Sequence, residues 1–176
     1  MNKKLNTEEI VRVSVGEFQE LPKIPLVVIL DNVRSMQNIG SVFRTADAFC
    51  LEKVVLCGIT ATPPNNEIHK SALGAEFSVK WEYYKHAKES VLKLKESGYC
   101  AISIEQTQNS IPLNYFEIDK SKRYAIVLGN EVFGVEQDTI DACDHSIEIP
   151  QFGTKHSLNV SVAGSIVIWD FFNKLR

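Results

Sequence analysis

The sequence predicts an α/β domain: a mostly parallel sheet with helices on both faces. Two observations predict it. Short apolar runs rich in β-branched residues alternate with helical segments along the chain, and clusters of polar residues directly follow three of the apolar runs. In parallel sheets of this kind, ligands bind beyond the carboxyl ends of the strands. We therefore expect the functional residues in the segments that follow Leu30, Leu128 and Ile149.

The first half of the chain predicts two strand–helix units. Residues 26–30 (LVVIL) form a buried strand bounded by Pro25 and Asp31. Residues 38–50 form a helix, because apolar side chains recur on one face at the helical period. That face carries Ile39, Val42, Phe43, Ala46, Phe49 and Cys50. Residues 53–57 form the next strand, residues 62–66 (TPPNN) a loop, and residues 77–81 a third strand.

The second half continues the alternation. Residues 84–97 form a helix that ends at Gly98. Strands are predicted over residues 99–104, 124–128 and 146–149, and a short helix over residues 135–142. A long final helix is predicted over residues 157–175, with Ser157 as its N-cap. We expect residues 1–24 to form an arm or a short helix, and residues 25–176 to form the domain.

The final helix has almost no polar face. A helix that is apolar all round must be buried on more than one side. We expect a second copy of the chain to cover one of those sides, which predicts a homodimer through this helix. The alternative is complete burial within one chain.

Composition narrows the class of protein. The chain has 176 residues, 44% of them hydrophobic and 23% charged, as in ordinary globular domains. We expect no membrane span and no signal peptide, and hence a cytoplasmic protein. The four cysteines form no CxxC pair, so we expect buried, reduced thiols and no metal site. The net charge of −3 lacks the excess of basic residues that nucleic-acid-binding proteins usually carry.

Three polar clusters carry the candidate chemistry. The first contains Ser35 and Asn38, either of which could be the N-cap of the helix, with Asn38 otherwise a functional residue. It also contains Arg44, which points about 140° away from Ile39 and so out of the core. The second places Gly129, where a ligand can approach the backbone, two residues before Glu131. The third holds Ser157, Asn159 and Ser161. Polar side chains in so apolar a helix either satisfy nearby backbone or line a site.

Other common motifs are absent from the sequence. No GxGxxG follows the first strand, and there is no Walker loop and no GxSxG elbow. His69, His86, His145 and His156 have no triad partner at a recognisable spacing, so we expect surface or structural roles for them.

The three clusters resemble the motifs of a known family. NVRSMQNIGSVFRTADAF, IVLGNEVFGV and IEIPQFGTKHSLNVSVA are similar, in order and spacing, to the motifs of the SpoU (TrmH-type) RNA 2′-O-ribose methyltransferases of the SPOUT superfamily. The resemblance extends from about Leu26 to Trp169. It implies an α/β fold with a C-terminal trefoil knot, which general topology rules disfavour.

The resemblance also implies a cofactor, a partner and site residues. The cofactor would be S-adenosylmethionine, with backbone contacts at Ile104, Gly129, Ile149 and Leu158. The functional side chains would be Asn38, Arg44, Glu131, Ser157 and Asn159. The substrate would be tRNA or rRNA, and the enzyme would be a dimer through its C-terminal helices.

The chemistry of ribose methylation suits these residues. A hydroxyl is a poor nucleophile at its free pKa. Arg44 would bind the adjacent phosphate and lower the pKa of the 2′-hydroxyl by its charge. Because a guanidinium stays protonated in proteins, we favour this role over that of a base, with the proton leaving through phosphate or water. Asn38 would orient Arg44, Glu131 would fix the loop or Arg44 itself, and Ser157 and Asn159 would position the cofactor loop and the ribose.

Two other functions stay open at this stage. One is a SPOUT-fold RNA-binding protein without catalysis, and the other is an enzyme of the same fold that methylates a base. With only a short arm before the first strand, the domain itself would have to grip RNA. The candidate residues for that grip are Lys3, Lys4, Arg12, Arg34, Lys70 and Lys155.

Overall fold

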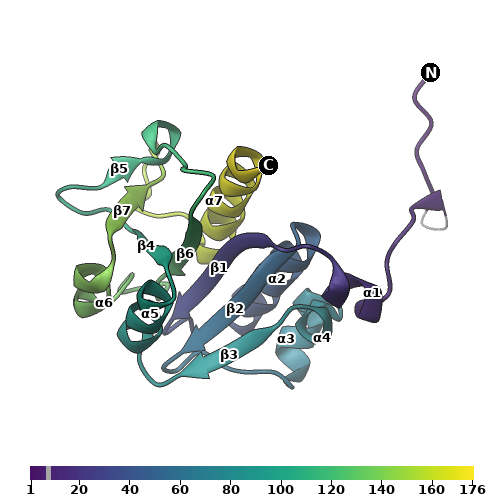
Figure 1. Cartoon of the computed structure of the whole chain (residues 1–176), viewed down its shortest axis with the longest axis horizontal. Coiled ribbons are helices and arrows are strands. Elements are labelled where there is room, and N and C mark those ends of the chain that lie inside the picture. Colours follow the sequence, from purple (N-terminus) through teal and green to yellow (C-terminus); the bar gives the residue numbers. More distant parts are fainter. Residues whose placement is uncertain (7–8) are drawn as a thin grey trace.

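The computed structural model describes residues 1–6 and 9–176. The predicted arm, residues 1–24, includes Thr7 and Glu8, which lie outside the described residues. The arm leads into a short helix, α1 (Val15–Glu20), and projects away from the rest of the chain (Figure 1). Ser14 and Glu17 form a capping box that fixes where α1 begins.

A seven-stranded sheet, in which every pairing is parallel, forms the centre of the fold (Figure 1). Its order is β3-β2-β1-β6-β4-β7-β5. The strands are β1 (Ile24–Asp31), β2 (Leu51–Cys57), β3 (Trp81–Tyr84), β4 (Tyr99–Ile104), β5 (Ile111–Pro112), β6 (Arg123–Leu128) and β7 (His145–Glu148). The predicted α/β class with a mostly parallel sheet is therefore confirmed, while the trefoil knot stays a prediction.

Helices cover both faces of the sheet. The remaining helices are α2 (Met36–Ala48), α3 (Asn66–Ala72), α4 (Ala75–Ser78), α5 (Ala87–Glu96), α6 (Gln137–Ala142) and α7 (Val160–Leu175), with a 3₁₀ turn, η2 (Leu113–Tyr115). Side chains of α2 and α7 pack into one buried cluster, and those of α5 into a second cluster on the opposite face. Alternate residues of β1 divide between the two: Val28 belongs to the first and Val27 to the second.

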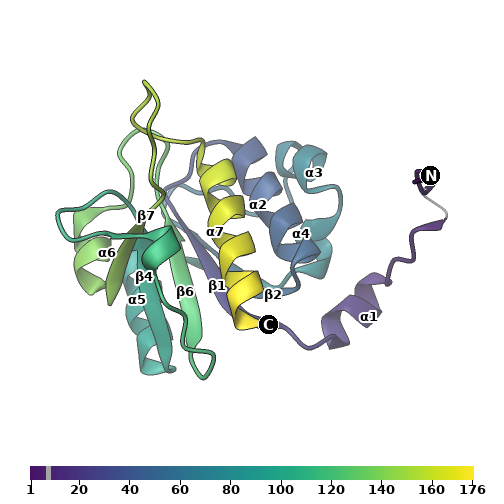
Figure 2. The same cartoon turned by 90° about the horizontal axis from the view of Figure 1, so that it is seen from above.

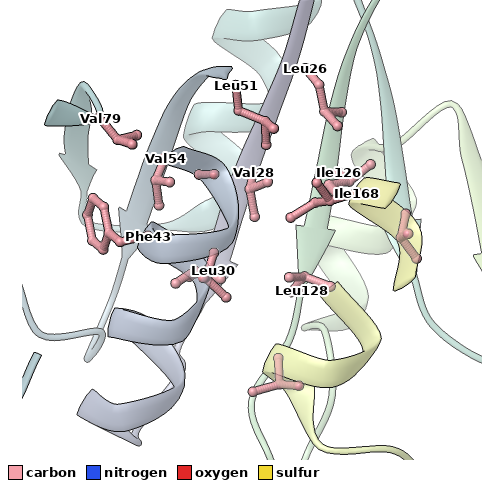
Figure 3. Packing of buried hydrophobic residues seen from close by; sticks show 14 of the residues in the cluster. Leu26, Val28, Leu30, Phe43, Leu51, Val54, Val79, Ile126, Leu128 and Ile168 are labelled. Carbon is pink, nitrogen blue, oxygen red and sulfur yellow. The ribbon is translucent and has the colours of Figure 1, made fainter. Parts of the chain in front are cut away.

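The cluster under α2 and α7 fixes the position of both helices. Phe43 of α2 and Ile168 of α7 are fully buried above the strands, beside residues such as Val28 and Ile126 (Figure 3). The two helices lie side by side (Figure 2), and Thr45 and Ser165 share a hydrogen bond of 3.1 Å between them. Burial of these side chains thus places the beginnings of α2 and α7 next to each other.

Several predicted element boundaries are wrong. Residues 77–81 do not form a strand, because a helix, α4, follows the left-handed Gly74 and the strand begins only at Trp81. Tyr84 ends that strand, so the helix predicted from residue 84 begins at Ala87. The loop predicted at residues 62–66 leads into an unpredicted helix, α3, which Asn65 caps through the N–H groups of Glu67 and Ile68.

Three further expectations need correction. The final helix begins at Val160 and not at Ser157, since Asn159 is its N-cap. The predicted strand over residues 146–149 spans His145–Glu148, and the helix predicted from residue 135 begins at Gln137. All four cysteines are free thiols, but only Cys57 is fully buried.

Within the part of the chain that the structure describes, no helix is long and apolar enough to cross a membrane. Over the same residues, no group of three or more His, Cys, Asp or Glu side chains is placed to hold a metal ion.

Candidate active site at the carboxyl edge of the sheet

A pocket of about 490 Å³ opens at the carboxyl ends of β4, β6 and β7. Ile104, Gly129, Ile149 and Leu158, the four residues expected to contact a cofactor, all line it. Glu131, Ser157 and Asn159 line it as well. Because parallel strands end at the same edge of a sheet, three segments far apart in the sequence meet around one hollow.

The loop after β6 forms one wall of this pocket and is tightly closed. The backbone N–H groups of Asn130 and Gly134 each donate to the carbonyl of the other, at 2.9 Å. A Cβ atom at Gly129 would lie 2.1 Å from the carbonyl carbon of Gly134, so no larger residue fits there without moving the loop. Gly129 is therefore required for close packing of the loop itself, and the predicted approach of a ligand to its backbone stays a prediction.

Asn130 anchors the same loop. Its side-chain amide donates to the carbonyl of Asn32 at 2.7 Å, and its Oδ1 accepts from the N–H groups of Val132 and Phe133 at 2.9 and 3.1 Å. Sequence reasoning missed this residue. The feature that could have identified it is an Asn directly after a predicted strand and beside a glycine, because Asn side chains at such positions commonly bond to nearby backbone.

A chain of hydrogen bonds joins the three predicted clusters. Asn38 Nδ2 donates to Glu131 Oε1 at 3.0 Å, and Asn159 Nδ2 donates to Asn38 Oδ1 at 3.1 Å. Asn38 is buried in the first turn of α2, where Ser35 and not Asn38 is the N-cap. The capping alternative for Asn38 is therefore wrong, and its side chain links α2 to the other two segments.

Glu131 is held as a carboxylate by three donors. Its oxygens accept from the backbone N–H groups of Arg34 and Ser35 and from the Asn38 amide, each at 3.0 Å. Partial burial opposes ionisation, but the hydrogen bonds from Arg34, Ser35 and Asn38 outweigh it and hold the pKa of Glu131 below its ordinary value. Glu131 therefore fixes the beginning of α2 against the pocket loop.

The beginning of α7 is set by Asn159. Its Oδ1 accepts from the N–H groups of Ser161 and Val162 and from the hydroxyl of Ser161. Asn159 therefore fits both alternatives expected for this polar helix start, since it satisfies nearby backbone and lines the pocket, whereas the Ser161 hydroxyl bonds to the side chain of Asn159. Ser157 is exposed on the pocket lining and does not cap the helix.

Arg44 is not part of this constellation within one chain. It is exposed, as expected, but it lines a different hollow with Arg12 of the arm, Asp47 and Ala75. Arg44 lies six positions after Asn38 in the helix, which places it about 120° around α2 and about 9 Å further along the axis. The expectation that Asn38 orients Arg44 is therefore wrong for a single chain. Of the two alternatives for Glu131, the structure shows contact with the loop before α2, through Arg34 and Ser35, and not with Arg44. Asn38 and Glu131 bond to each other instead.

The pocket is lined by acidic and neutral side chains. Glu105, Glu131 and Glu148 line it, and none of its lining residues is Lys or Arg. Glu105 also braces the wall, because its Oε2 accepts from the N–H of Val135 at 3.0 Å. Gln106 donates to the carbonyl of His156 at 2.9 Å and so ties the end of β4 to the segment before α7. Neither residue was predicted, since a Glu-Gln pair after a strand has no distinctive sequence pattern.

These features define a class of protein: a parallel α/β domain whose ligand pocket is built from strand-end loops and the segment before the C-terminal helix. The sequence profile of the SpoU rRNA methylase family matches residues 25–169. The chain belongs to that family.

Individual relatives agree with this assignment. The chain is 34% identical over 145 residues to the 23S rRNA (guanosine(2553)-2'-O)-methyltransferase RlmP of Bacillus subtilis, covering 81% of this chain and 56% of that protein. It is 31% identical over 160 residues to a protein of Staphylococcus saprophyticus described as a TrmH-family tRNA/rRNA methyltransferase, covering 91% of this chain and 63% of that one. The chain thus spans about three fifths of the length of these relatives.

Solved structures show the same fold. The TrmH/SpoU tRNA-modifying enzyme of A. aeolicus superposes with a TM-score of 0.80 at 25% identity, over 91% of this chain and 80% of that one. An AdoMet-bound rRNA methyltransferase of Sinorhizobium meliloti superposes with a TM-score of 0.79 at 24% identity, over 90% of this chain and 60% of that one.

Proposed function

We propose that the chain is an S-adenosylmethionine-dependent methyltransferase that transfers a methyl group to a ribose 2′-hydroxyl of tRNA or rRNA. The observation that carries the proposal is the meeting of Asn38, Glu131 and Asn159 at one pocket that Gly129, Ile149 and Leu158 also line. The names of the relatives, one of them a 2′-O-methyltransferase of rRNA, support the choice of reaction and substrate.

The pocket fits S-adenosylmethionine by shape and by charge. Gly129 lets the loop after β6 close tightly against Gly134, where a Cβ would collide, and this close packing gives the pocket a fixed backbone wall. Glu105, Glu131 and Glu148 line a pocket without lysine or arginine, which suits a ligand with a sulfonium and an ammonium group. When bound, this cofactor supplies an electrophilic methyl group. Ile104, Gly129, Ile149 and Leu158 would hold it.

The side chains of this chain would then position the acceptor. Glu131 and Asn38 hold the beginning of α2 against the pocket, while Asn159 and Ser157 lie on the rim where a ribose would enter. Binding of the RNA phosphate also needs a cationic side chain, and no Lys or Arg lines the pocket. Arg44 would supply it, bind the phosphate and lower the pKa of the 2′-hydroxyl.

A homodimer explains how Arg44 can act although it lies outside the pocket of its own chain. On α7, Val162, Ile166 and Trp169 form an exposed apolar stripe, which we call the α7 stripe. Contrary to the complete-burial alternative, one chain leaves this side of the helix open. The helix α7 itself packs against α2, the helix that carries Arg44, so an interface on the stripe would bring Arg44 of the partner subunit toward a neighbouring pocket. The expected cytoplasmic location stays a prediction.

Two measurements test the proposed function. Calorimetry should show S-adenosylmethionine binding to the wild-type chain, and tritium should pass from labelled cofactor into tRNA or rRNA as alkali-resistant dinucleotides. Arg44→Ala should abolish transfer and leave cofactor affinity and thermal stability nearly unchanged, because Arg44 is exposed and outside the pocket. Absence of binding heat would instead support a non-catalytic RNA-binding protein, and alkali-labile products would support base methylation.

A further inference from the structure

A second hollow lies beside the candidate active site. We call this hollow the side pocket; its volume is about 980 Å³. It shares three lining residues with the active-site pocket: Glu105, Gln106 and Phe133. The two hollows are thus neighbours, with Phe133 on the boundary between them.

Phe133 is exposed although its backbone is fixed. The side chain is 86% exposed, an unfavourable position for a large apolar ring. Its own N–H donates to Asn130, and the loop on either side is closed by the Asn130–Gly134 backbone pair. The exposed ring is therefore carried by a loop that hydrogen bonds hold in place.

The lining of the side pocket suits a neutral planar group. Four carboxamide side chains line it: Gln106, Gln108, Asn109 and Gln137. Its carboxylates already have partners: Glu105 accepts from Val135, Asp141 accepts from the Gln137 amide at 2.8 Å, and Asp144 pairs with Lys95 at 2.9 Å. Its lining residues include three carboxylates and no Lys or Arg, which disfavours a phosphate there.

We propose that the side pocket receives an unstacked base of the RNA strand whose ribose enters the active-site pocket. The base stacks on Phe133, and the carboxamides of Gln108 and Asn109, both exposed, pair with its edge. Aromatic rings and carboxamides are the groups that proteins use to bind single-stranded bases. Phe133 is then a positioning residue for the substrate. The proposal rests on the proposed function, because the RNA is the substrate of that reaction.

Kinetics with the RNA that the wild-type chain methylates give the first test. Phe133→Ala should lower kcat/KM for RNA about tenfold or more, chiefly through KM, because stacking is made equally before and during reaction. Phe133→Tyr should stay close to wild type, since the ring is kept. Gln108→Ala should lower kcat/KM by a smaller factor. Tyr115→Ala is the matched control: Tyr115 is 74% exposed, lies outside both pockets and should have no effect.

A second test does not depend on methyl transfer. Total tRNA and rRNA fragments substituted with 4-thiouridine are irradiated with the wild-type chain, and the adducts are mapped by mass spectrometry. We expect adducts at Phe133 or within residues 106–109. If the wild-type chain transfers no methyl group but gives these adducts, the proposed function fails while the base site stands.

Four results would overturn the proposal. Phe133→Ala within twofold of wild type would exclude stacking, as would equal losses in the Ala and Tyr variants. A loss of cofactor affinity in Phe133→Ala, measured by calorimetry, would place the ring at the cofactor instead. If light scattering gave the Phe133→Ala variant a different oligomeric mass from the wild-type chain, the ring would lie in an interface between two copies of the protein.

Discussion

At the residue scale, the carboxylate of Glu131 connects the pocket loop to α2. It accepts hydrogen bonds from two backbone N–H groups and from Asn38. A neutral amide of the same size can accept fewer of these bonds and accepts them more weakly. Glu131 therefore has a structural contribution that can be measured apart from activity.

We predict that Glu131→Gln lowers the free energy of unfolding by roughly 1–2 kcal/mol at pH 7, because the hydrogen bonds to the carboxylate are weakened. The loss is no larger because the carboxylate is solvent-accessible and its interactions are screened. Hydrogen bonding holds the folded-state pKa below the ordinary value of 4.5. The stabilisation is therefore fully present above pH 4.5 and is lost as the pH falls through the lower folded-state pKa.

Urea unfolding from pH 7 to pH 3 measures this difference. The wild-type and Glu131→Gln curves should converge as the pH falls. Glu117→Gln is the control, because Glu117 is exposed and contributes no hydrogen bond to the pocket. A constant difference over the whole pH range would contradict the assigned role.

The sequence predicted which residues surround the pocket better than it predicted how they are connected. Periodicity and strand ends were enough to place Gly129, Glu131 and Asn159 at one edge of the sheet. Periodicity could not show that Arg44 lines another hollow. It predicts which face of the helix carries Arg44, but not which other segments of the chain lie beside that face. Asn130 and Glu105 were missed because their roles lie in backbone contacts made only after folding.

At the element scale, the beginning of α7 depends on a single cap. Asn159 accepts from the N–H groups of Ser161 and Val162, whereas Ser157 makes no such bond. A side chain at the N-cap satisfies donors that a helix otherwise leaves unpaired. The two polar residues predicted together at this helix start therefore differ in what they contribute to stability.

We predict that Asn159→Ala lowers the free energy of unfolding by about 1 kcal/mol, the usual contribution of an N-cap. It should also weaken methyl transfer, because the bond from Asn159 to Asn38 is lost. Ser157→Ala should leave unfolding unchanged while it slows transfer. Chemical denaturation of both variants checks the prediction, and equal stability losses would contradict it.

Most elements followed from hydrophobic periodicity, and the exceptions share a cause. The strand over Tyr99–Ile104 was predicted without error, because it is an apolar run directly after a glycine stop. The segment from α3 to β3 was not, since its helices are only seven and four residues long and are defined by Asn65 and Gly74. Elements so short carry too few apolar residues to show a period.

At the scale of the whole molecule, the α7 stripe is the feature that one chain leaves unexplained. Ile166 and Trp169 are 38% and 52% exposed on a helix whose opposite side is buried. An exposed apolar stripe of this kind is a candidate interface. If a second copy covers it, oligomeric state and activity are coupled.

We predict that Ile166→Glu converts a dimer to a monomer and abolishes methyl transfer without a loss of helical content. Burial of a charge in a symmetric apolar interface is strongly unfavourable, and the substitution occurs once in each copy. Light scattering gives the mass and circular dichroism the helical content. Leu92→Glu is the control, because Leu92 is similarly exposed on α5, on the other face of the sheet. A dimeric and active Ile166→Glu variant would show that this stripe is not the interface.

The activity of a mixed dimer shows whether Arg44 acts on the pocket of the partner subunit. One subunit carries Arg44→Ala, and the other carries Gly129→Ala, whose new Cβ would collide with the backbone of Gly134 and displace the loop that forms the pocket wall. If Arg44 acts on the pocket of the partner subunit, the mixed dimer keeps one complete site and about half of the wild-type rate, although each parent dimer is inactive. A mixed dimer as inactive as its parents would contradict the claim that the site is shared between two chains.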